Sequence, residues 1–492
     1  MRRRGFALLL TPLLFSSACV VGPDYEKPEM EAPGAFVSQK VLTQLNAGKE
    51  STTIATDWWR GFTDDTLDQL VRKGLENNFR VAAAEARVKE AHARIVLADA
   101  GDNLKVNAGL DNALEEEFSL DRARSTTTGS VFSALSLRLP LDVAGRFERG
   151  VQAARAGFEA SQADLRGIVL SISSQITREY LQLRGNQRQL DLLRESVGLQ
   201  DKTLSIVRSR YEAGLSPELD MRRAETTVEN LRAGIPSLEQ ALLNSRNRLA
   251  SLTGQYPGVY EELLKTHRDI PVYQGKIPEF VPMEVLSMRP DIRQSEETLK
   301  AAVARIGVAE ADFYPTFDLI GQIGIGAAGV VGVPTMDILL ASLGTLINQI
   351  VTAGGARQAN LDIARAQAEE ALANYKQLLR DASEEVESTL AAIQASLARQ
   401  QSLGKAVEAS GVSSYQAETL YRQGLISFLN VVDAQRVLAN GKQQLAAERT
   451  NYATQIATLF RALGTRIDSP ASGEPGGPAE TPPPDAGHSP IS

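Results

Sequence analysis

The side chains that most often do chemistry in proteins are sparse and scattered in this chain. Its histidines, His92, His267 and His488, are too far apart in the sequence to suggest a metal site or an acid–base pair. No glycine-rich loop stands between a predicted strand and a predicted helix, so no phosphate-binding loop is predicted. Paired carboxylates such as Glu384 and Glu385 fall in a long helical pattern, where they are expected to be solvated. The sequence therefore predicts a protein that is not an enzyme and holds no metal or organic cofactor.

One residue is placed for a covalent modification. Cys19, the only cysteine, follows the basic residues Arg2–Arg4, a short apolar run and three small residues, which together predict a signal peptide over residues 1–18. A lone cysteine in an exported protein has no partner for an internal disulfide. Its position resembles a bacterial lipobox, in which the cysteine receives a diacylglycerol and an N-acyl chain. Ser16 stands where a lipobox usually has leucine, and ordinary cleavage nearby is the alternative; Val20 after the cysteine favours the outer membrane.

The composition limits the kind of partner. The chain has 492 residues and a net charge of −8, and beyond the N-terminal arginines it has no cluster of Lys and Arg. A nucleic-acid partner is therefore not expected. No stretch of about 18 or more apolar residues occurs, so no transmembrane helix is predicted. Residues 465–492 are rich in Pro, Gly and Ser and are expected to be disordered.

The strongest internal pattern is a repeat. Eight residues from Tyr211 to Gly254 return 210 positions later in unbroken spacing (421 − 211 and 464 − 254). This period is far beyond the roughly 20–50 residues of solenoid repeats. The sequence therefore predicts two similar structural halves in one chain, at 57–254 and 255–464.

Two segments in each half have the period-2 alternation of β-strands. They are Leu104–Leu114, Ser130–Leu139, Thr316–Gly326 and a stretch within Ser342–Thr352. A polar, charged loop over Glu115–Thr128 separates the first two. One face of each strand is apolar and the other is mixed, as in transmembrane strands of about ten residues. A small soluble sheet with one buried face is the alternative that these residues leave open.

The segments before the first strand differ from one another in their hydrophobic periodicity. Residues 19–56 have no sustained period and are expected to form an extended segment. A helix is predicted to open after Asp57, with Asp64 or Asp65 as its cap. Helical periodicity continues over 82–100.

A long helix is predicted after the strands of each half. A heptad-like stripe from Val151, with no proline between Pro140 and Pro217, predicts a helix of about 60 residues, or roughly 90 Å. The second half repeats it from about Ala356 to Arg422. Each long helix ends at a repeated Tyr-x-x-Gly-Leu motif whose glycine can supply a left-handed cap. A single return helix is expected to follow, so each half contains a helical hairpin whose tip lies far from the strands.

With these elements in order, the chain resembles the TolC/OprM family of outer membrane factors, in its lipoprotein (NodT-like) subgroup. The segments that carry the resemblance are Cys19 with Val21–Tyr25, Trp58–Val71, Arg289–Arg293, Ala309–Pro315 and Val432–Arg436. The resemblance implies an internally duplicated α+β membrane protein. The resemblance also implies a trimer with four strands per chain, which form a 12-stranded outer membrane β-barrel continuous with a long periplasmic α-helical barrel.

Physical chemistry gives an independent reason for the trimer. A four-stranded sheet in lipid leaves two edges of unpaired backbone groups, and each such group costs several kcal/mol. Closure takes at least about eight strands. Several copies therefore have to combine their strands around a common bore.

The resemblance also implies a function. The protein is expected to be the passive exit duct of a resistance-nodulation-division (RND) efflux system, conducting drugs or other small molecules to the outside. Its partners are then a periplasmic adaptor protein, an inner-membrane pump that supplies the energy, and outer membrane lipid. The alternatives are a duct for type I protein secretion, or a structural coiled-coil lipoprotein against which the paired strand segments argue.

Site residues follow from the resemblance at the hairpin tips. Asp220 and Asp433 match positions that form a ring of carboxylates at a resting gate, and Asn430 stands where relatives carry a further acid. The alternative for Asp433 is a solvated helix residue. The same resemblance assigns adaptor docking to six tip residues: Gly214, Leu215, Ser216, Gly424, Leu425 and Ser427. As residues alone, the tips are equally consistent with simple turns.

Overall fold

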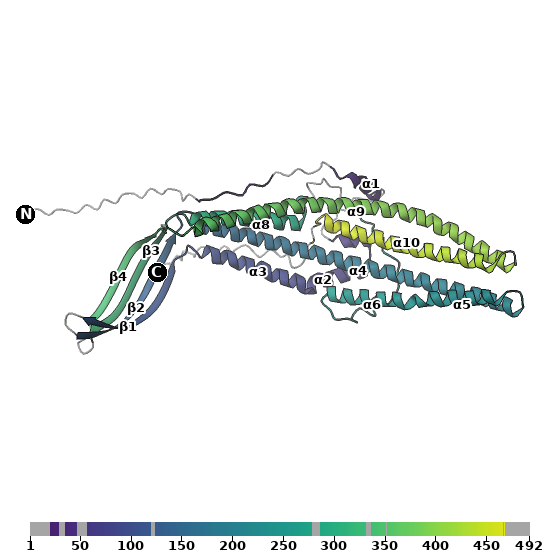
Figure 1. Cartoon of the computed structure of the whole chain (residues 1–492), viewed down its shortest axis with the longest axis horizontal. Coiled ribbons are helices and arrows are strands. Elements are labelled where there is room, and N and C mark those ends of the chain that lie inside the picture. The colour runs from purple at the N-terminus through teal and green to yellow at the C-terminus, as the bar shows by residue number, and fades with distance from the viewer. Residues whose placement is uncertain are drawn as a thin grey trace, which may run out of the picture. The chain divides into compact units, whose positions relative to one another are not determined.

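The computed structural model describes residues 20–28, 35–46, 57–119, 124–277, 286–330, 336–350, 352–465 and 467. Its main elements in chain order are α1 (Lys40–Asn46), α2 (Asp65–Asn77), α3 (Phe79–Asp99), β1 (Lys105–Ser119), β2 (Arg124–Leu141), α4 (Arg146–Glu212), α5 (Glu218–Ala233), α6 (Ile235–Leu252), α8 (Pro290–Ala311), β3 (Thr316–Val330), β4 (Met336–Asn348), α9 (Ala356–Arg422) and α10 (Phe428–Ala462) (Figure 1). The predicted signal peptide, Cys19 and nearly all of the predicted tail lie outside the described residues. Within the described part of the chain, none of the helices has the length and hydropathy needed to cross a membrane.

The chain divides into two compact units. Unit 1 draws on residues 1–30, 87–162 and 294–377. Unit 2 draws on residues 31–86, 163–293 and 378–492. All four strands belong to unit 1, whereas α5, α6 and α10 belong to unit 2.

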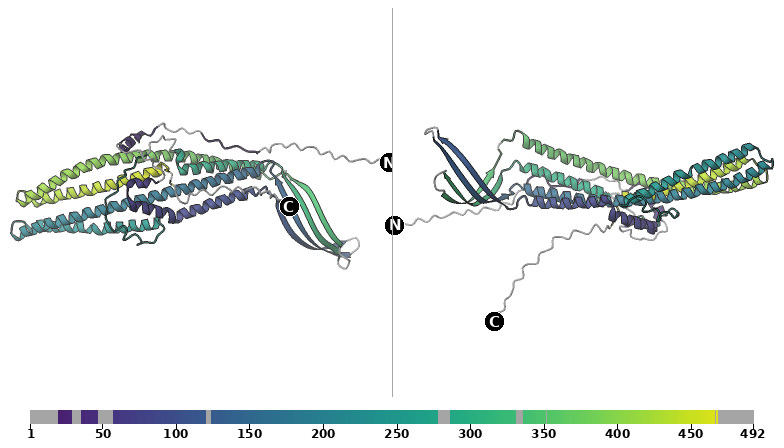
Figure 2. Two further views of the ribbon diagram at one scale, coloured as in Figure 1. Left: turned by 180° about the vertical axis from the view of Figure 1, so that it is seen from behind. Right: turned by 90° about the horizontal axis from the view of Figure 1, so that it is seen from below.

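The strands form one antiparallel sheet in the order β1-β2-β3-β4, and Figure 2 shows them curving together. Both predicted strand pairs are confirmed, with longer strands than expected. The predicted loop over Glu115–Thr128 is wrong at both ends, because β1 continues to Ser119 and β2 begins at Arg124. An antiparallel hairpin is bonded through its backbone, so polar side chains do not stop the pairing. β4 also begins before the predicted stretch, at Met336.

The pairing register sorts the strand residues into two faces. Directly opposed residues of antiparallel strands project from the same face. The apolar face carries large exposed side chains from all four strands: Val106, Leu110, Leu114, Val131, Leu135, Leu137, Leu319, Ile323, Ile325, Leu339, Leu343 and Ile347. The mixed face carries Lys105, Asn107, Asp111, Phe132, Ser136, Arg138, Asp318, Ile320, Gln322, Ile338, Leu340 and Ser342. The predicted alternation of the strands is therefore confirmed.

The helix predicted after Asp57 lies in the core of unit 2. Trp58 is fully buried and stacks on Phe460 with ring centroids 5.1 Å apart. After a short 3-10 turn, α2 begins, and the Asp64 carboxylate accepts hydrogen bonds from the N–H groups of Thr66 and Leu67 at 2.9 and 3.1 Å. Of the two predicted caps, Asp64 is the one used.

The prediction of an extended segment over residues 19–56 is wrong for α1. Val41, Leu42 and Leu45 of this helix are buried. These positions fall on one face of a helix, so burial of a short apolar stripe stabilises a turn that composition alone does not reveal.

The two long helices are confirmed: α4 exceeds its predicted length, and α9 has the predicted bounds. α4 and α9 have 67 residues each, or about 100 Å at 1.5 Å per residue. The single return helix predicted for the first half is wrong, because α5 ends at Ala233 and α6 begins at Ile235, with Gly234 between them. Pro236 has no N–H to donate to the carbonyl of Arg232, so proline fits the start of a new helix better than the interior of a continuous one. In the second half α10 runs unbroken.

Candidate functional site

The two hairpin tips have the same backbone geometry. At the end of α4 the N–H of Gly214 donates to the carbonyl of Tyr211, and the N–H of Leu215 to the carbonyl of Arg210, both at 2.8 Å. Gly214 has a φ of 71°, the left-handed conformation that closes this pattern of caps. α9 ends in the same way at Gly424, with a φ of 77° and both bonds at 2.9 Å. The predicted glycine caps are confirmed.

Apolar side chains are exposed at both tips. Leu215 and Leu425 are 69% and 67% exposed, and Leu219 and Leu429, one turn further on, are 56% and 57% exposed. Ser427 is the N-cap residue of α10, but its side chain makes no capping hydrogen bond. Exposed apolar groups gathered in this way are typical of a surface that contacts another molecule.

The predicted gate residues all lie at these tips. Asp220 is in the first turn of α5 and accepts a hydrogen bond from the Ser216 hydroxyl at 3.4 Å. Asp433 is 61% exposed on α10, and its carboxylate lies 2.6 Å from the Arg436 guanidinium. Asn430 is exposed three residues before Asp433. The ion pair offsets part of the negative charge expected at Asp433.

A residue that the sequence analysis missed joins the two tips. The Arg210 guanidinium of α4 lies 5.0 Å from the centroid of the Tyr421 ring and donates to the Tyr421 carbonyl at 3.2 Å. Tyr421 also packs on Phe428, with centroids 5.9 Å apart. Burial raises the pKa of the Tyr421 hydroxyl, and the charge of Arg210 opposes that rise. The repeat held a signal for this residue, because the position equivalent to Arg210 is Leu420.

Below the tips, a buried polar contact holds α10 against α4. Gln435 is 2% exposed; its side chain accepts a hydrogen bond from Gln200 at 2.8 Å and donates one to Thr203 at 3.2 Å. Paired buried amides of this kind fix one register between helices, because any shift leaves polar atoms unsatisfied.

In unit 1, Arg149 holds the segment that follows Cys19. Its guanidinium donates to the carbonyls of Val21 and Gly22 at 3.0 and 2.9 Å and pairs with the Asp24 carboxylate at 2.8 Å. Arg149 is 4% exposed. These bonds fix the chain two residues after Cys19. No spacing or repeat in the sequence marks Arg149, so sequence analysis could not find it.

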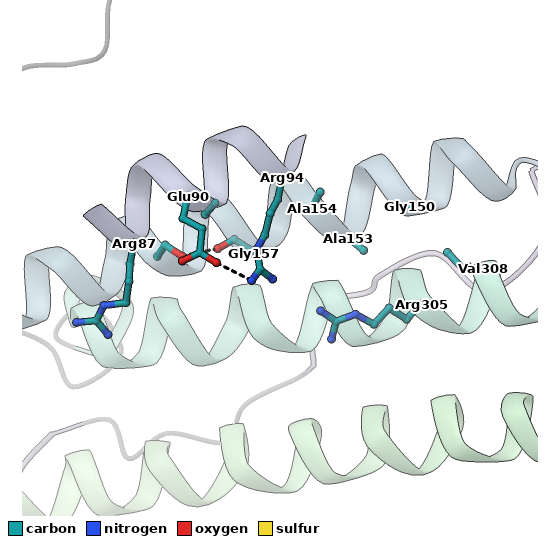
Figure 3. A pocket seen from close by; sticks show the side chains of 11 residues that line it. Arg87, Glu90, Arg94, Gly150, Ala153, Ala154, Gly157, Arg305 and Val308 are labelled. Carbon is teal, nitrogen blue, oxygen red and sulfur yellow. Dashed lines mark hydrogen bonds and ion pairs between the residues drawn. The ribbon is translucent and has the colours of Figure 1, made fainter. Parts of the chain in front are cut away.

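Unit 1 also contains a cavity of about 480 Å³ between α3, α4 and α8 (Figure 3). Its floor on α4 consists of small residues, and Arg87, Arg94 and Arg305 stand at its rim. Arg94 and Glu90 form an ion pair at 2.6 Å on one face of α3. No site residue predicted from the sequence lines this cavity.

Comparison with known proteins gives a consistent result. The model of the outer membrane efflux protein family matches residues 70–255 and 281–465. The chain is 30% identical over 473 residues to nodulation protein T of Rhizobium leguminosarum bv. viciae, covering 95% of each chain. It is 28% identical over 452 residues to the cation efflux system protein CusC of Escherichia coli (strain K12), covering 91% of this chain and 96% of CusC. The solved structure of the outer-membrane channel OprN superposes with a TM-score of 0.84 at 28% identity, over 91% of this chain and 99% of OprN.

The chain therefore belongs to the outer membrane efflux protein family. It is an exit channel for efflux at the outer membrane of a Gram-negative cell, and the family resemblance stated from its motifs is confirmed. The relatives are transport proteins rather than enzymes.

Proposed function

We propose that three copies of the chain form the passive exit duct of an RND-type efflux system. The duct carries drugs or other small molecules from the periplasm and the inner-membrane pump to the outside. The chain itself performs no enzymatic step and holds no cofactor, so energy comes from the pump.

The observation that carries this proposal is the open sheet. Among the described strands, β1 and β4 each pair on one side only, which leaves a row of backbone donors and acceptors at either edge. Such groups cost several kcal/mol each in lipid, so the edges have to be joined. When β4 of one copy pairs with β1 of the next, three copies make a closed barrel of 12 strands. The apolar face then meets lipid and the mixed face lines the bore.

Two halves, 57–254 and 255–464, are proposed to be structural repeats. α9 begins and ends 210 residues after α4 (356 − 146 and 422 − 212). Glycines in the left-handed conformation recur at the same offset, at 145, 214 and 254 and again at 355, 424 and 464. These correspondences support a duplication, and they explain why one chain presents two tips of equal geometry.

The tips are proposed to form the resting gate. Asp220 lies in the first turn of α5, and Asn430 and Asp433 lie near the start of α10, where three chains would bring nine polar side chains around one axis. Carboxylates in such a ring favour cations over anions in the closed pore. Arg436 limits the effect, because it pairs with Asp433.

The exposed tip leucines are proposed to dock the periplasmic adaptor. Leu215 and Leu425 stand at the apices, directly after the glycines that reverse the chain, with Ser216 and Ser427 beside them. The docking site therefore consists of Gly214, Leu215, Ser216, Gly424, Leu425 and Ser427.

Cys19 is proposed to carry the lipid that anchors residues 19–56 at the outer membrane. Arg149 would then hold the segment that follows the lipid-bearing cysteine against α4. Replacement of Arg149 by Met should leave acylation of Cys19 unchanged, as measured by mass spectrometry. It should also make residues 20–28 accessible to proteases, because their hydrogen bonds to the guanidinium are lost.

The duct is tested by measuring currents from the purified protein in planar lipid bilayers, together with its mass in detergent. A trimer with discrete single-channel currents is expected. A monomer that is soluble without detergent and carries no current would contradict the proposal. In the cell, deletion of the gene should raise sensitivity to toxic compounds, and the same deletion would leave protein secretion unchanged.

A further inference from the structure

Four residues form one row across the sheet. The register pairs Asp111 of β1 with Phe132 of β2, Phe132 with Gly326 of β3, and Gly326 with Ile338 of β4. Because opposed residues share a face, all four belong to the mixed face. That face lines the bore under the proposed function, and the inference below rests on that function.

The ring of Phe132 lies flat on the sheet. A Cβ placed on Gly326 would come within 2.5 Å of Phe132 Cδ2, and one on Gly324 within 2.8 Å of Phe132 Cζ. The ring therefore occupies the space that side chains at both positions would need. On the next strand Ile338 and Leu340, 36% and 40% exposed, oppose these glycines. The result is an apolar strip on the mixed face, with one face of the aromatic ring turned away from the backbone.

A carboxylate stands directly beside this strip. Asp111 is exposed, and its carboxylate makes neither a hydrogen bond nor an ion pair with the described residues. On the same face of β2, Arg138 is bound to Asp318 at 2.7 Å, and Arg124 lies eight residues from Phe132, or about 26 Å along the strand. Lys105 is on the same face of β1 but six residues away, or about 20 Å along the strand. The negative charge next to the Phe132 ring is therefore uncompensated by these cations.

Closure of the barrel brings no positive charge from β4 of the neighbouring copy to Asp111. The edge that would meet β1 is β4 of the neighbouring copy. Residues 337–348 of β4 contain no Lys, Arg or His. The neighbouring strand thus adds apolar surface at Asp111 but no counter-charge.

An aromatic face next to a free carboxylate suits a particular kind of molecule. A cation over an aromatic ring gains about 0.5–1 kcal/mol when exposed and about 2 kcal/mol or more when desolvated. We propose that Asp111, Phe132 and the apolar strip form a binding site in the bore for lipophilic organic cations, which combine an apolar body with a positive charge. Gly324 and Gly326 are essential parts of it, because they let the ring lie flat and leave the bore open.

Block of single-channel current tests the site. The probes are tetraphenylphosphonium and tetraphenylborate, which have the same shape and opposite charge. Tetraphenylphosphonium should block the wild-type channel at lower concentration than tetraphenylborate. Asp111→Asn and Phe132→Leu should each weaken the phosphonium block about fivefold or more, the size expected for loss of one cation–π or ionic contact. Asp111→Asn should leave block by the borate unchanged or stronger.

Leu110→Ala is the matched control, because Leu110 is the neighbour of Asp111 on the apolar face. It should leave the phosphonium block unchanged. Equal block by the two probes, or phosphonium block that neither Asp111→Asn nor Phe132→Leu alters, would overturn the site while leaving the channel established. Absence of any wild-type current would instead overturn the proposed function.

Discussion

The two hairpin tips share a backbone but not an environment. Tyr211 and Tyr421 occupy equivalent positions one turn before the glycine, yet they are 39% and 5% exposed. The difference arises because Arg210 and Phe428 cover Tyr421, whereas the position equivalent to Phe428 in the first tip is Glu218. Glu218 pairs with Arg222 at the surface instead.

The turn at each tip and the packing around it depend on different residues. The Tyr-x-x-Gly-Leu motif determines the turn, since left-handed glycine and the two capping hydrogen bonds are local. The side chains that differ between the repeats determine which tip is covered. The first tip is open and charged, and the second is packed against α4 through Arg210. We therefore expect substitutions in the second tip to impair function more than equivalent substitutions in the first tip.

The largest expected effect comes from a charge at the glycine of the second tip. Gly424→Asp should abolish efflux complementation while leaving trimer formation and membrane insertion intact. A Cβ on Gly424 would lie 3.9 Å from the Arg210 guanidinium, so the new carboxylate would compete with the Tyr421 carbonyl for Arg210. Complementation of a deletion strain, with the trimer assayed by gel electrophoresis, provides the measurement.

Two matched variants sharpen that result. Gly424→Asn introduces a residue that tolerates the left-handed conformation and carries no charge, so the variant should retain most efflux complementation. A Cβ on Gly214 meets no atom within 4 Å, so Gly214→Asp should impair efflux less than Gly424→Asp. Equal loss in the two Asp variants would contradict the proposed asymmetry, and wild-type efflux by Gly424→Asp would count against docking at the tip.

Removal of the residue that joins the tips should have the next largest effect. Arg210→Leu gives the first half the residue of the second half. It removes the guanidinium from the Tyr421 ring and from the Tyr421 carbonyl, which keeps only the Gly424 N–H as a donor. Loss of a hydrogen bond from a charged donor costs about 1.5–3 kcal/mol, so the closed tips should be destabilised and the open probability should rise about tenfold. Single-channel recording measures it. Arg210→Lys keeps the charge but loses the planar guanidinium, so its open probability should lie between those of the wild type and Arg210→Leu. An open probability in Arg210→Leu equal to that of the wild type would show that the contact does not hold the tips closed.

Ion selectivity should respond in opposite directions to two changes in the second tip. Asp433→Asn removes a carboxylate and should lower the preference for cations, whereas Arg436→Gln frees that carboxylate and should raise it. The reversal potential across a potassium chloride gradient is the readout. Because the pair is exposed and screened, each shift should be modest, about twofold in the permeability ratio. Shifts in the same direction would remove Asp433 from the conducting path.

The smallest expected effect is on the pH dependence of the second tip. Burial raises the pKa of Tyr421 above its ordinary value of about 10. The contribution of the neutral phenol to stability is therefore complete below about pH 10 and is lost as the pH rises through the pKa of the folded state. A spectrophotometric tyrosinate titration of the wild type minus Tyr421→Phe should show one group that ionises late. A difference curve centred at about pH 10 would contradict the burial of Tyr421.

Sequence patterns predicted most of the helices and strands, because the periodicity of each element depends only on its own residues. Alternation in 130–139 and 316–326 follows from the geometry of a strand, and the proline-free stripe after Val151 follows from that of a helix. Two wrong predictions had different causes. The break between α5 and α6 follows from one proline near Gly234, a local signal that the prediction did not use, whereas α1 depended on apolar partners elsewhere in unit 2.

For the candidate site, the sequence by itself determined the turns, the exposed leucines and the positions of the acids, because a capped helix end needs only its own residues. Tertiary structure alone decided that Arg210 covers Tyr421, that Arg149 holds Val21 and that Phe132 lies over Gly326. Each of these contacts joins residues more than one hundred positions apart. Which residue each of these side chains contacts depends on how whole helices and strands pack, and the spacing of residues within one segment does not predict it.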